Sequence, residues 1–278
     1  MNRAPIVLTT DFGLEDPYVG VMKGVILGIN PKARIIDHSH YVEPQNIAHG
    51  SMLLSTSYNY FPDHTIHISV VDPGVGTERS ALIIMTPRAY LVGPDNGLFS
   101  GILGKYSDDS RSDTANIHVP AGCKAFRITN SEVFLTPTSD TFHGRDIFAP
   151  VGAHLSLGAT PSELGDPVES VLGYAGPDLV ITEDRIVGEV IYVDHFGNLI
   201  TNISNTLLTE DANVIVEMAG SCIRSIHRTF NDGNTTTPNE PIALLGSNGY
   251  LEIAVPNGHA SRSLLLSSGD QVILYKSH

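Results

Sequence analysis

The sequence predicts an α/β fold: an N-terminal, mostly parallel sheet flanked by helices, followed by a smaller C-terminal β-barrel domain. Strand-like and helix-like runs alternate through the first half, as in a parallel sheet with helices on both faces. Beyond residue 185 only short strands separated by turn residues follow, which is typical of a small barrel. We therefore predict an N-terminal domain over 1–165, a linker over 166–184 and a C-terminal domain over 185–278.

Each predicted element follows from local pattern. In the first half, β-rich or alternating runs predict strands over 6–10, 34–37, 65–71, 81–84 and 90–92. Apolar residues at helical spacing predict helices over 19–29, 46–58, 98–103 and 142–157, the last with a kink or break at Pro150. A Gly- and Pro-rich stretch over 161–177 suggests the linker. Short strands are predicted over 185–193, 213–218, 241–245, 250–255 and 271–275.

The charge balance restricts the partners. The chain has a formal net charge of −14, with 30 acidic and 16 basic residues, so it repels nucleic-acid phosphates and anionic lipid. We expect no nucleic-acid partner and no membrane association, whereas a cationic small molecule suits the negative electrostatic field of this chain.

The two cysteines, Cys123 and Cys222, are expected to be partly buried thiols in a reducing compartment. The N-terminus lacks a signal-peptide core and no stretch is long enough to span a membrane, so a cytoplasmic location is expected.

Two aspartates lie where this fold places functional groups. Asp11 follows the predicted strand 6–10, and Asp72 follows the predicted strand 65–71. In parallel α/β sheets, ligands bind beyond the carboxyl ends of the strands. Asp11, in TTDFG, can hold a ribose diol or a metal ion; the alternative is a turn or N-cap aspartate. Asp72 opens DPGVGTER, and Arg79 can fold back onto it; the alternative is a structural salt bridge.

Other polar residues of the first half are candidates on weaker grounds. GPDNGLF contains Asn96, and by itself this segment is typical of a turn. TFHGRD contains His143, a residue type that serves acid–base chemistry, binds metals or makes structural hydrogen bonds. His38 and His40 form an H-x-H pair, but no matching framework of acidic residues and histidines lies nearby. We therefore expect no metal site.

The candidates of the second half lie on predicted turns. DHFGNLITN contains Asp194 and Asn198, which suit recognition of an amine and a purine edge; the alternative is a hairpin turn. Phe230 can stack on a base or fill the barrel core. Ser247 and Asn248 begin the segment SNGY, which is typical of another turn.

Taken in order, six segments carry a family resemblance: TTDFG, VVDPGVGTER, GPDNGLF, TFHGRD, DHFGNLITN and GSNGYLEIA. The chain resembles the SAM hydroxide adenosyltransferases (S-adenosylmethionine hydrolases), which are related to the SAM-dependent fluorinase and chlorinase. The resemblance covers nearly the whole chain. It implies a homotrimer with each site between the N-domain of one subunit and the C-domain of its neighbour. It also implies that S-adenosylmethionine is the substrate, with no cofactor.

The resemblance implies a role for each candidate. Asp72, Arg79 and His143 match the hydrolase triad. The implied substrate contacts are Asp11 with the ribose diol, Asp194 with the methionine ammonium, Asn198 with adenine, Phe230 stacked on the base, Ser247 and Asn248 at the methionine carboxylate, and Asn96. The halogenating relatives carry a larger basic residue beside that serine, so backbone amides are expected to bind the carboxylate here.

The carboxylate of Asp72 favours water over a halide as the nucleophile. The halogenases carry tyrosine at this position, and the fluorinase carries tyrosine and serine where this chain has His143 and Gly144. A carboxylate beside C5′ of the ribose would repel a halide by several kcal/mol at low effective dielectric. We therefore expect hydrolysis of S-adenosyl-L-methionine at C5′. The alternatives are a halogenase of the same family, a non-catalytic SAM- or adenosine-binding protein and, on the Asp and His clusters alone, a metal-dependent phosphohydrolase.

Overall fold

The chain divides into two units, each with its own sheet. The computed structural model describes residues 4–107, 116–174, 176–177, 179–208, 214–230 and 240–276. The first unit is Met1–Ala175 and the second is Gly176–His278. Their boundary falls inside the stretch 166–184 that the sequence predicts as a linker. The start of the strand predicted over 213–218 and part of the predicted linker lie outside the described residues.

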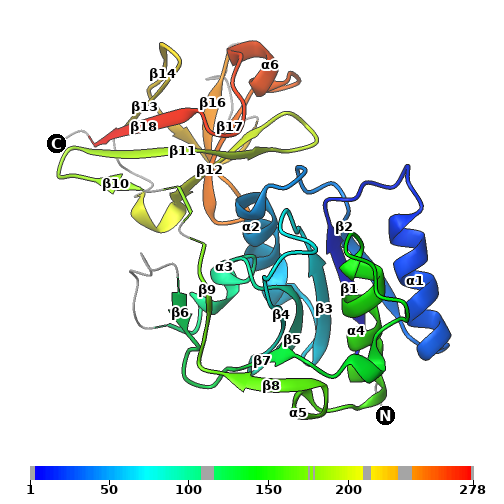
Figure 1. Ribbon diagram of the computed structural model, residues 1–278. Helices are drawn as coiled ribbons and strands as arrows, with labels where there is room; N and C mark the ends of the chain where they lie inside the picture. The colour runs from blue at the N-terminus through cyan, green and yellow to red at the C-terminus, as the bar shows by residue number, and fades with distance from the viewer. Residues whose placement is uncertain are drawn as a thin grey trace. The chain divides into compact units, whose positions relative to one another are not determined.

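A seven-stranded sheet forms the centre of the first unit, in the order β2-β1-β3-β5-β4-β7-β8 (Figure 1). Its strands are β1 (Ile6–Thr10), β2 (Ile35–Ser39), β3 (Thr65–Val70), β4 (Ala81–Met85), β5 (Ala89–Pro94), β7 (Lys124–Ile128) and β8 (Gly165–Val168). Strands β2, β1, β3 and β5 pair in parallel, whereas β4, β7 and β8 continue the sheet antiparallel. The predicted parallel-rich α/β fold is confirmed.

Helices cover both faces of this sheet (Figure 1). They are α1 (Tyr18–Ile29), α2 (Ile47–Ser57), α3 (Ser100–Leu103), a π-helix (Gly144–Phe148) continued by α4 (Ala149–Leu157), and α5 (Pro161–Leu164). Apolar residues of β3 alternate with the pleat, so Ile66 and Ile68 pack with α1 and α4 in one core. On the other face, α2 and α3 pack with Leu82 and Leu91 in a second core.

The parallel pairing of β1 and β3 determines where the site lies. Their register aligns Ile6 with Ile66 and Thr10 with Val70. The two strands therefore end at the same level, and the chain leaves both at one edge of the sheet. Asp11 and Asp72 are the first acidic residues beyond these ends.

Several stretches differ from the sequence prediction; strand β7, for example, lies in a segment for which no strand was predicted. Residues 165–172, expected largely within a linker, contain β8 and the short strand β9 (Ser170–Leu172), which pairs with β6 (Asn116–His118). Polar and Pro-containing residues form these strands because both lie at sheet edges, where one side of the backbone needs no partner strand. A kink or break is predicted at Pro150, and the helix changes type beside it: the π-helix ends at Phe148, and Pro150 lies in the first turn of α4.

The second unit contains a nine-stranded, nearly closed, barrel-like sheet in the order β14-β13-β18-β11-β12-β17-β16-β15, with β10 paired to β11. The strands are β10 (Val180–Ile181), β11 (Arg185–Val193), β12 (Leu199–Ser204), β13 (Val214–Met218), β14 (Ser221–Ile223), β15 (Ile226–His227), β16 (Ile242–Leu245), β17 (Tyr250–Ala254) and β18 (Gln271–Lys276), with one short helix, α6 (Ala260–Leu264). Alternate residues of these strands form one apolar core. The predicted C-terminal barrel is confirmed.

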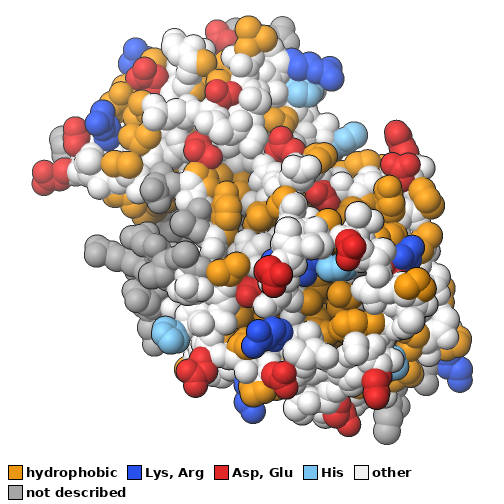
Figure 2. All heavy atoms as spheres, in the orientation of Figure 1, with side chains coloured by type: hydrophobic (Ala, Val, Ile, Leu, Met, Phe, Trp, Pro, Cys, Tyr) orange, Lys and Arg blue, Asp and Glu red, His pale blue; other side chains and the backbone are white. Residues whose placement is uncertain are grey.

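Three further features of the described chain relate to the expected location and partners: its helices, its cysteines and its exposed apolar side chains. No helix in the described part of the chain has the length and apolar character needed to cross a membrane. Cys123 is half-buried and Cys222 is exposed, and both are free thiols. Apolar side chains appear on the face of the first unit drawn in Figure 2, and α1 itself leaves Tyr18, Val21 and Leu27 exposed.

Candidate functional site

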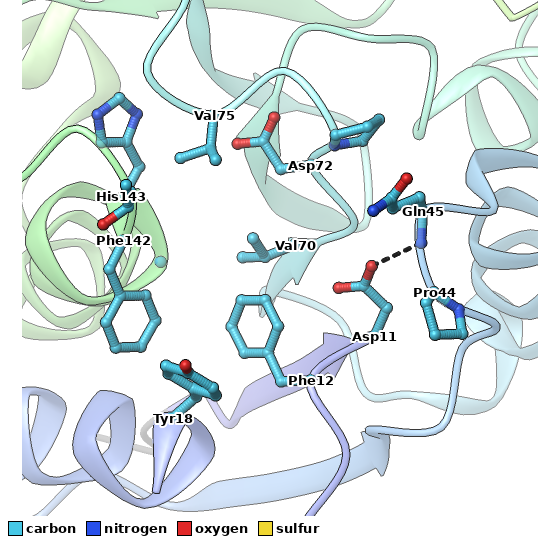
Figure 3. Close-up of a pocket in the computed structure, with 13 residues that line it drawn as sticks. Asp11, Phe12, Tyr18, Pro44, Gln45, Val70, Asp72, Val75, Phe142 and His143 are labelled. Carbon is cyan, nitrogen blue, oxygen red and sulfur yellow. Dashed lines mark hydrogen bonds between the residues drawn. The ribbon is translucent and has the colours of Figure 1, made fainter. Parts of the chain in front are cut away.

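A cavity of about 390 Å³ opens where β1 and β3 end (Figure 3). Four segments supply its walls: the chain after β1 with the start of α1, the loop before α2, the end of β3 with the loop that carries Asp72, and the loop that carries His143. The lining residues are Asp11, Phe12, Tyr18, Pro44, Gln45, Val70, Asp72, Pro73, Val75, Thr141, Phe142, His143 and Gly144. The fold therefore brings together three of the predicted site residues, Asp11, Asp72 and His143, in one cavity.

Arg79 connects Asp72 to His143. Its Nε donates to Oδ1 of Asp72 at 2.9 Å, and its Nη2 donates to Oδ2 of the same carboxylate. Nη2 also lies 2.9 Å from Nδ1 of His143. The side chains of Arg79 and Asp72 are 9% and 5% exposed, so water weakens this bidentate pair little.

These contacts define the protonation of His143. A guanidinium has only donors, so Nδ1 of His143 must accept from Arg79 and the single proton of the neutral ring sits on Nε2. Burial and the positive charge of Arg79 lower the pKa of His143, although nearby carboxylates including Asp72 oppose the shift. The imidazole is therefore neutral at pH 7 and directs an N–H donor away from Arg79.

Two anchors hold the loops that carry these groups. Gly76 has a φ of +77°, and a Cβ at this position would overlap the carbonyl of Asp140, so only glycine lets the two loops touch. Near His143, the fully buried carboxylate of Asp146 accepts hydrogen bonds from the backbone and hydroxyl of Ser139 and pairs with Arg145. Burial opposes its ionisation, but these bonds hold the pKa of Asp146 below its usual value.

Asp11 faces the same cavity from the end of β1. Its Oδ2 accepts a hydrogen bond of 2.8 Å from the backbone N–H of Gln45 (Figure 3). Gln45 adopts a left-handed backbone, with φ of 64°, which is uncommon for a residue with a side chain. Burial raises the pKa of Asp11, and the charge of Asp72 contributes in the same direction. A ligand that donates hydrogen bonds to Asp11 would relieve this cost of ionisation.

Three aromatic rings form the apolar wall of the cavity. Phe12, Tyr18 and Phe142 contact one another edge to face, with ring centroids 5.2 to 5.8 Å apart. A Cβ on Gly144 would lie 3.2 Å from Phe142 and 3.4 Å from Phe12, so glycine permits this packing. These rings give the cavity an apolar wall, while Asp11 and Asp72 supply its acidic groups.

Asn96 does not line the cavity. Its Nδ2 donates to the carbonyl of Val71 at 2.9 Å, and its Oδ1 accepts from the backbone N–H of Leu98. Both polar atoms of the side chain are thus used on the backbone. Asn96 supports the residue that precedes Asp72 and positions that carboxylate indirectly.

In the second unit, Asp194 and Asn198 are bonded to each other. Oδ1 of Asp194 accepts from the backbone N–H groups of Phe196 and Asn198, and its Oδ2 accepts from Nδ2 of Asn198 at 3.0 Å. The hairpin-turn interpretation of this segment is therefore correct as local geometry, and the turn fixes the orientation of Asp194.

The turn between β16 and β17 holds two further candidates. Ser247 is exposed, while the side chain of Asn248 accepts from the backbone of Tyr250 and hydrogen bonds with Tyr192 of β11. Phe230 is 50% exposed and does not belong to the barrel core.

The histidine pair after β2 has ordinary structural partners. Nδ1 of His38 lies 3.1 Å from the hydroxyl of Thr9, while His40 bonds with Thr10 and Asp37. Within the described ranges, no group of three His, Cys, Asp or Glu side chains is placed to hold a metal ion. These hydrogen bonds account for the H-x-H pair, although they were not apparent from its spacing.

Sequence reasoning missed several residues of the site. Gln45 and the ring of Tyr18 line the cavity, and Glu252 lies in the second unit beside Asp194. None of these residues is an aspartate that follows a strand, and none belongs to a glycine-rich turn, which were the patterns used to predict site residues. The sequence could have indicated only Glu252: side chains alternate between the two faces of strand β17, which places Glu252 on the same face as Tyr250.

The fold and the cavity together define a two-domain protein, α/β sheet followed by β-barrel, with a carboxylate, a guanidinium and an imidazole joined at the sheet's edge. The chain belongs to the SAM hydroxide adenosyltransferase family. Residues 6–165 match the N-terminal domain of that family and residues 188–273 match its C-terminal domain. The resemblance found in the six sequence segments is thereby confirmed.

Relatives cover nearly the whole chain. A protein of Thermus thermophilus named (R)-S-adenosyl-L-methionine hydrolase is 39% identical, over 97% of this chain and 99% of its own length. A protein of the same name from Methanocaldococcus jannaschii is 36% identical, over 97% and 95%. A fluorinase of an Actinoplanes species is more distant, at 25% identity over 91% of each chain. The crystal structure of an uncharacterized conserved protein from Thermotoga maritima matches with a TM-score of 0.83 and 36% identity, covering 97% of this chain and 99% of that one.

Proposed function

We propose that this protein hydrolyses S-adenosyl-L-methionine to adenosine and L-methionine by attack of water on C5′ of the ribose. The proposal is supported above all by Asp72 and His143, which are joined through Arg79 and line a cavity that Asp11 also lines. Relatives at 35–39% identity over nearly the full length carry the name of this activity.

In this mechanism Asp72 orients and deprotonates the water. The carboxylate accepts one bond on each oxygen from Arg79 and keeps further lone pairs for a water molecule. The water oxygen forms the bond to C5′ as the C5′–S bond breaks, and the electron pair stays on sulfur. Methionine leaves as a neutral thioether, so no general acid is required. Asp72 takes the proton because Nδ1 of His143 already accepts from Arg79.

Arg79 serves mainly as a positioning group. Of its five N–H donors, two bind Asp72, one binds His143 and one binds the carbonyl of Ser80. One donor of Nη1 remains for the developing hydroxide. The neutral His143 completes the hydrogen-bond chain and offers its Nε2–H to the nucleophile or a second water.

The remaining assignments concern substrate binding. Asp11 holds the ribose diol, and Asp194 holds the methionine ammonium. Asn198 contacts adenine through its carbonyl oxygen, since its amide nitrogen binds Asp194. The methionine carboxylate binds at the turn of Ser247 and Asn248. Phe230, half exposed, is the base-stacking ring.

Product analysis in oxygen-labelled water tests the reaction. Hydrolysis places the label in the 5′-oxygen of adenosine. A 5′-halo product formed in the presence of chloride or fluoride would replace the proposal with halogenation. Bound S-adenosylmethionine without turnover would indicate a binding protein, and loss of turnover with a chelator would indicate a metal-dependent hydrolase.

We also propose a cytoplasmic homotrimer with each site between the first unit of one subunit and the second unit of its neighbour. The candidate residues lie in both units, and the exposed apolar residues of α1 give the first unit a surface suited to contact. Light scattering should give three times 29.8 kDa. Mixing inactive Asp72→Asn and Asp194→Ala chains should restore activity, because some sites then combine two intact units. A fully active monomer would contradict the trimer.

A further inference from the structure

Glu252 is a largely buried residue whose carboxylate has no partner among the described residues. It is 9% exposed, on β17, and makes no hydrogen bond or ion pair with any residue of the described chain. Burial and the charge of Asp194 raise the pKa of Glu252. Buried charges in proteins are normally paired, so this group calls for a cation from outside the barrel.

The sheet register places Glu252 beside Asp194. Tyr192 pairs with Ile200 and Ile200 pairs with Glu252, so these three side chains form a row across β11, β12 and β17. Asp194 follows Tyr192 by two residues, which returns its side chain to the same face of the sheet. None of these residues belongs to the barrel core, so the row lies on the outer face of the barrel.

Glu252 also touches the turn that holds Ser247 and Asn248. A Cβ built on Gly246 would lie 3.0 Å from Oε2 of Glu252 and 2.8 Å from Oδ1 of Asn248. Only glycine leaves these two polar groups so close to the backbone. The carboxylate of Glu252 therefore adjoins the start of the turn, and it is near enough to Asp194 for the two charges to interact.

Asp194 alone has too little free capacity for an ammonium group. Three of its lone-pair sites already accept hydrogen bonds within its own turn, from Phe196 and twice from Asn198. A carboxylate offers about four such sites, whereas an ammonium has three N–H donors. No described residue donates a hydrogen bond to the carboxylate of Glu252, so this carboxylate can accept from the N–H groups of the ammonium that Asp194 leaves unbound.

We propose that Glu252 is a second binding residue for the α-ammonium of the substrate's amino-acid group, acting together with Asp194. The proposal rests on the proposed function. The ammonium and carboxylate of an α-amino acid are attached to one carbon, so their binding groups must adjoin. Glu252 satisfies this because it adjoins the turn of Ser247 and Asn248 and shares a face of the sheet with Asp194.

Glu252→Gln tests the proposal while keeping the shape of the side chain. KM for S-adenosylmethionine should rise about tenfold or more, with a smaller change in kcat. An analogue in which hydrogen replaces the α-ammonium should be bound equally by the variant and the wild type. The matched control is Glu217→Gln on β13 of the same sheet, which removes the same charge elsewhere and should change neither value.

Two readouts separate this role from a structural one. Adenosine lacks the amino-acid group, so its affinity should be unchanged in Glu252→Gln, which also shows that the variant is folded. Without ligand, the variant should have a higher Tm than the wild type, because the repulsion from Asp194 is gone. Loss of adenosine affinity, a lower Tm, or a KM within twofold of the wild type would overturn the inference. Absence of any turnover in the wild type would instead contradict the proposed function.

Discussion

Nη2 of Arg79 lies 2.9 Å from Nδ1 of His143 while the same guanidinium holds both oxygens of Asp72. The imidazole is therefore fixed as an acceptor at Nδ1, and its protonation would place two donors face to face. This arrangement connects the pH dependence of the reaction to a histidine that contacts the carboxylate only through arginine.

Activity should decline on the acid side as His143 takes a proton. Burial and Arg79 lower the pKa of His143, so its neutral form persists below the ordinary value of about 6.5. Activity is present above the lowered pKa and is lost as the pH falls through it. His143→Asn keeps an acceptor oxygen near the position of Nδ1 but cannot titrate, so the acid limb of its kcat/KM profile should disappear. An unchanged limb in this variant would assign the titration to another group.

Asp72→Asn should reduce kcat by at least about 100-fold with little change in KM, because the amide neither deprotonates water nor pairs with both donors of Arg79. Steady-state kinetics on purified protein measures this. Asp140→Asn is the matched control, since that exposed aspartate lies in the neighbouring loop and does not line the cavity. A tenfold or smaller loss in Asp72→Asn would remove Asp72 as the base.

The sequence predicted the frame of this site better than its detail. Asp11 and Asp72 were located because parallel strands end at a common edge, a rule that needs only strand assignments. The pairing of Arg79 with Asp72 was one of two interpretations, and only three-dimensional packing distinguished a pair at the cavity from one elsewhere. Strand β8 was missed because its pairing with β7 spans almost forty residues of chain and leaves no local pattern. Long-range contacts, not propensity, determine such elements.

Gly76→Ala should impair catalysis far more than Gly74→Ala. The backbone of Gly76 is left-handed, and an added Cβ would overlap the carbonyl of Asp140, so the two loops must separate. At Gly74, the nearest heavy atom to an added Cβ is 3.5 Å away, which is ordinary contact. We expect kcat to fall about tenfold or more in the first variant and to stay within threefold in the second. Equal effects would show that contact between the loops does not position Asp72.

Acid should destabilise the fold through His67. This residue of β3 is 2% exposed, and its ring packs edge to face with that of Phe61, with the ring centroids 5.1 Å apart. Neither nitrogen of the His67 ring has a hydrogen-bond partner in the described chain. Burial lowers the pKa of His67 to about 3. In the unfolded chain the pKa returns to about 6.5, so the unfolded state binds more protons at intermediate pH. The free energy of unfolding is therefore highest above the pKa that His67 has in the unfolded chain, and it decreases as the pH falls below that value.

His67→Phe should remove this contribution. When the pH is lowered from 7.5 to 5.0, His67 should reduce the unfolding free energy of the wild type by about 2 kcal/mol. The reason is that His67 stays neutral in the folded state but takes up a proton in the unfolded state. Phenylalanine has a similar shape, does not titrate and leaves no unsatisfied polar atom, so the variant should also be more stable at pH 7.5. Urea unfolding of both proteins at the two pH values measures the difference. If the variant keeps the full acid sensitivity of the wild type, the protons are taken up by other groups, of which His49, with a pKa lowered to about 4 by burial, is the first to examine.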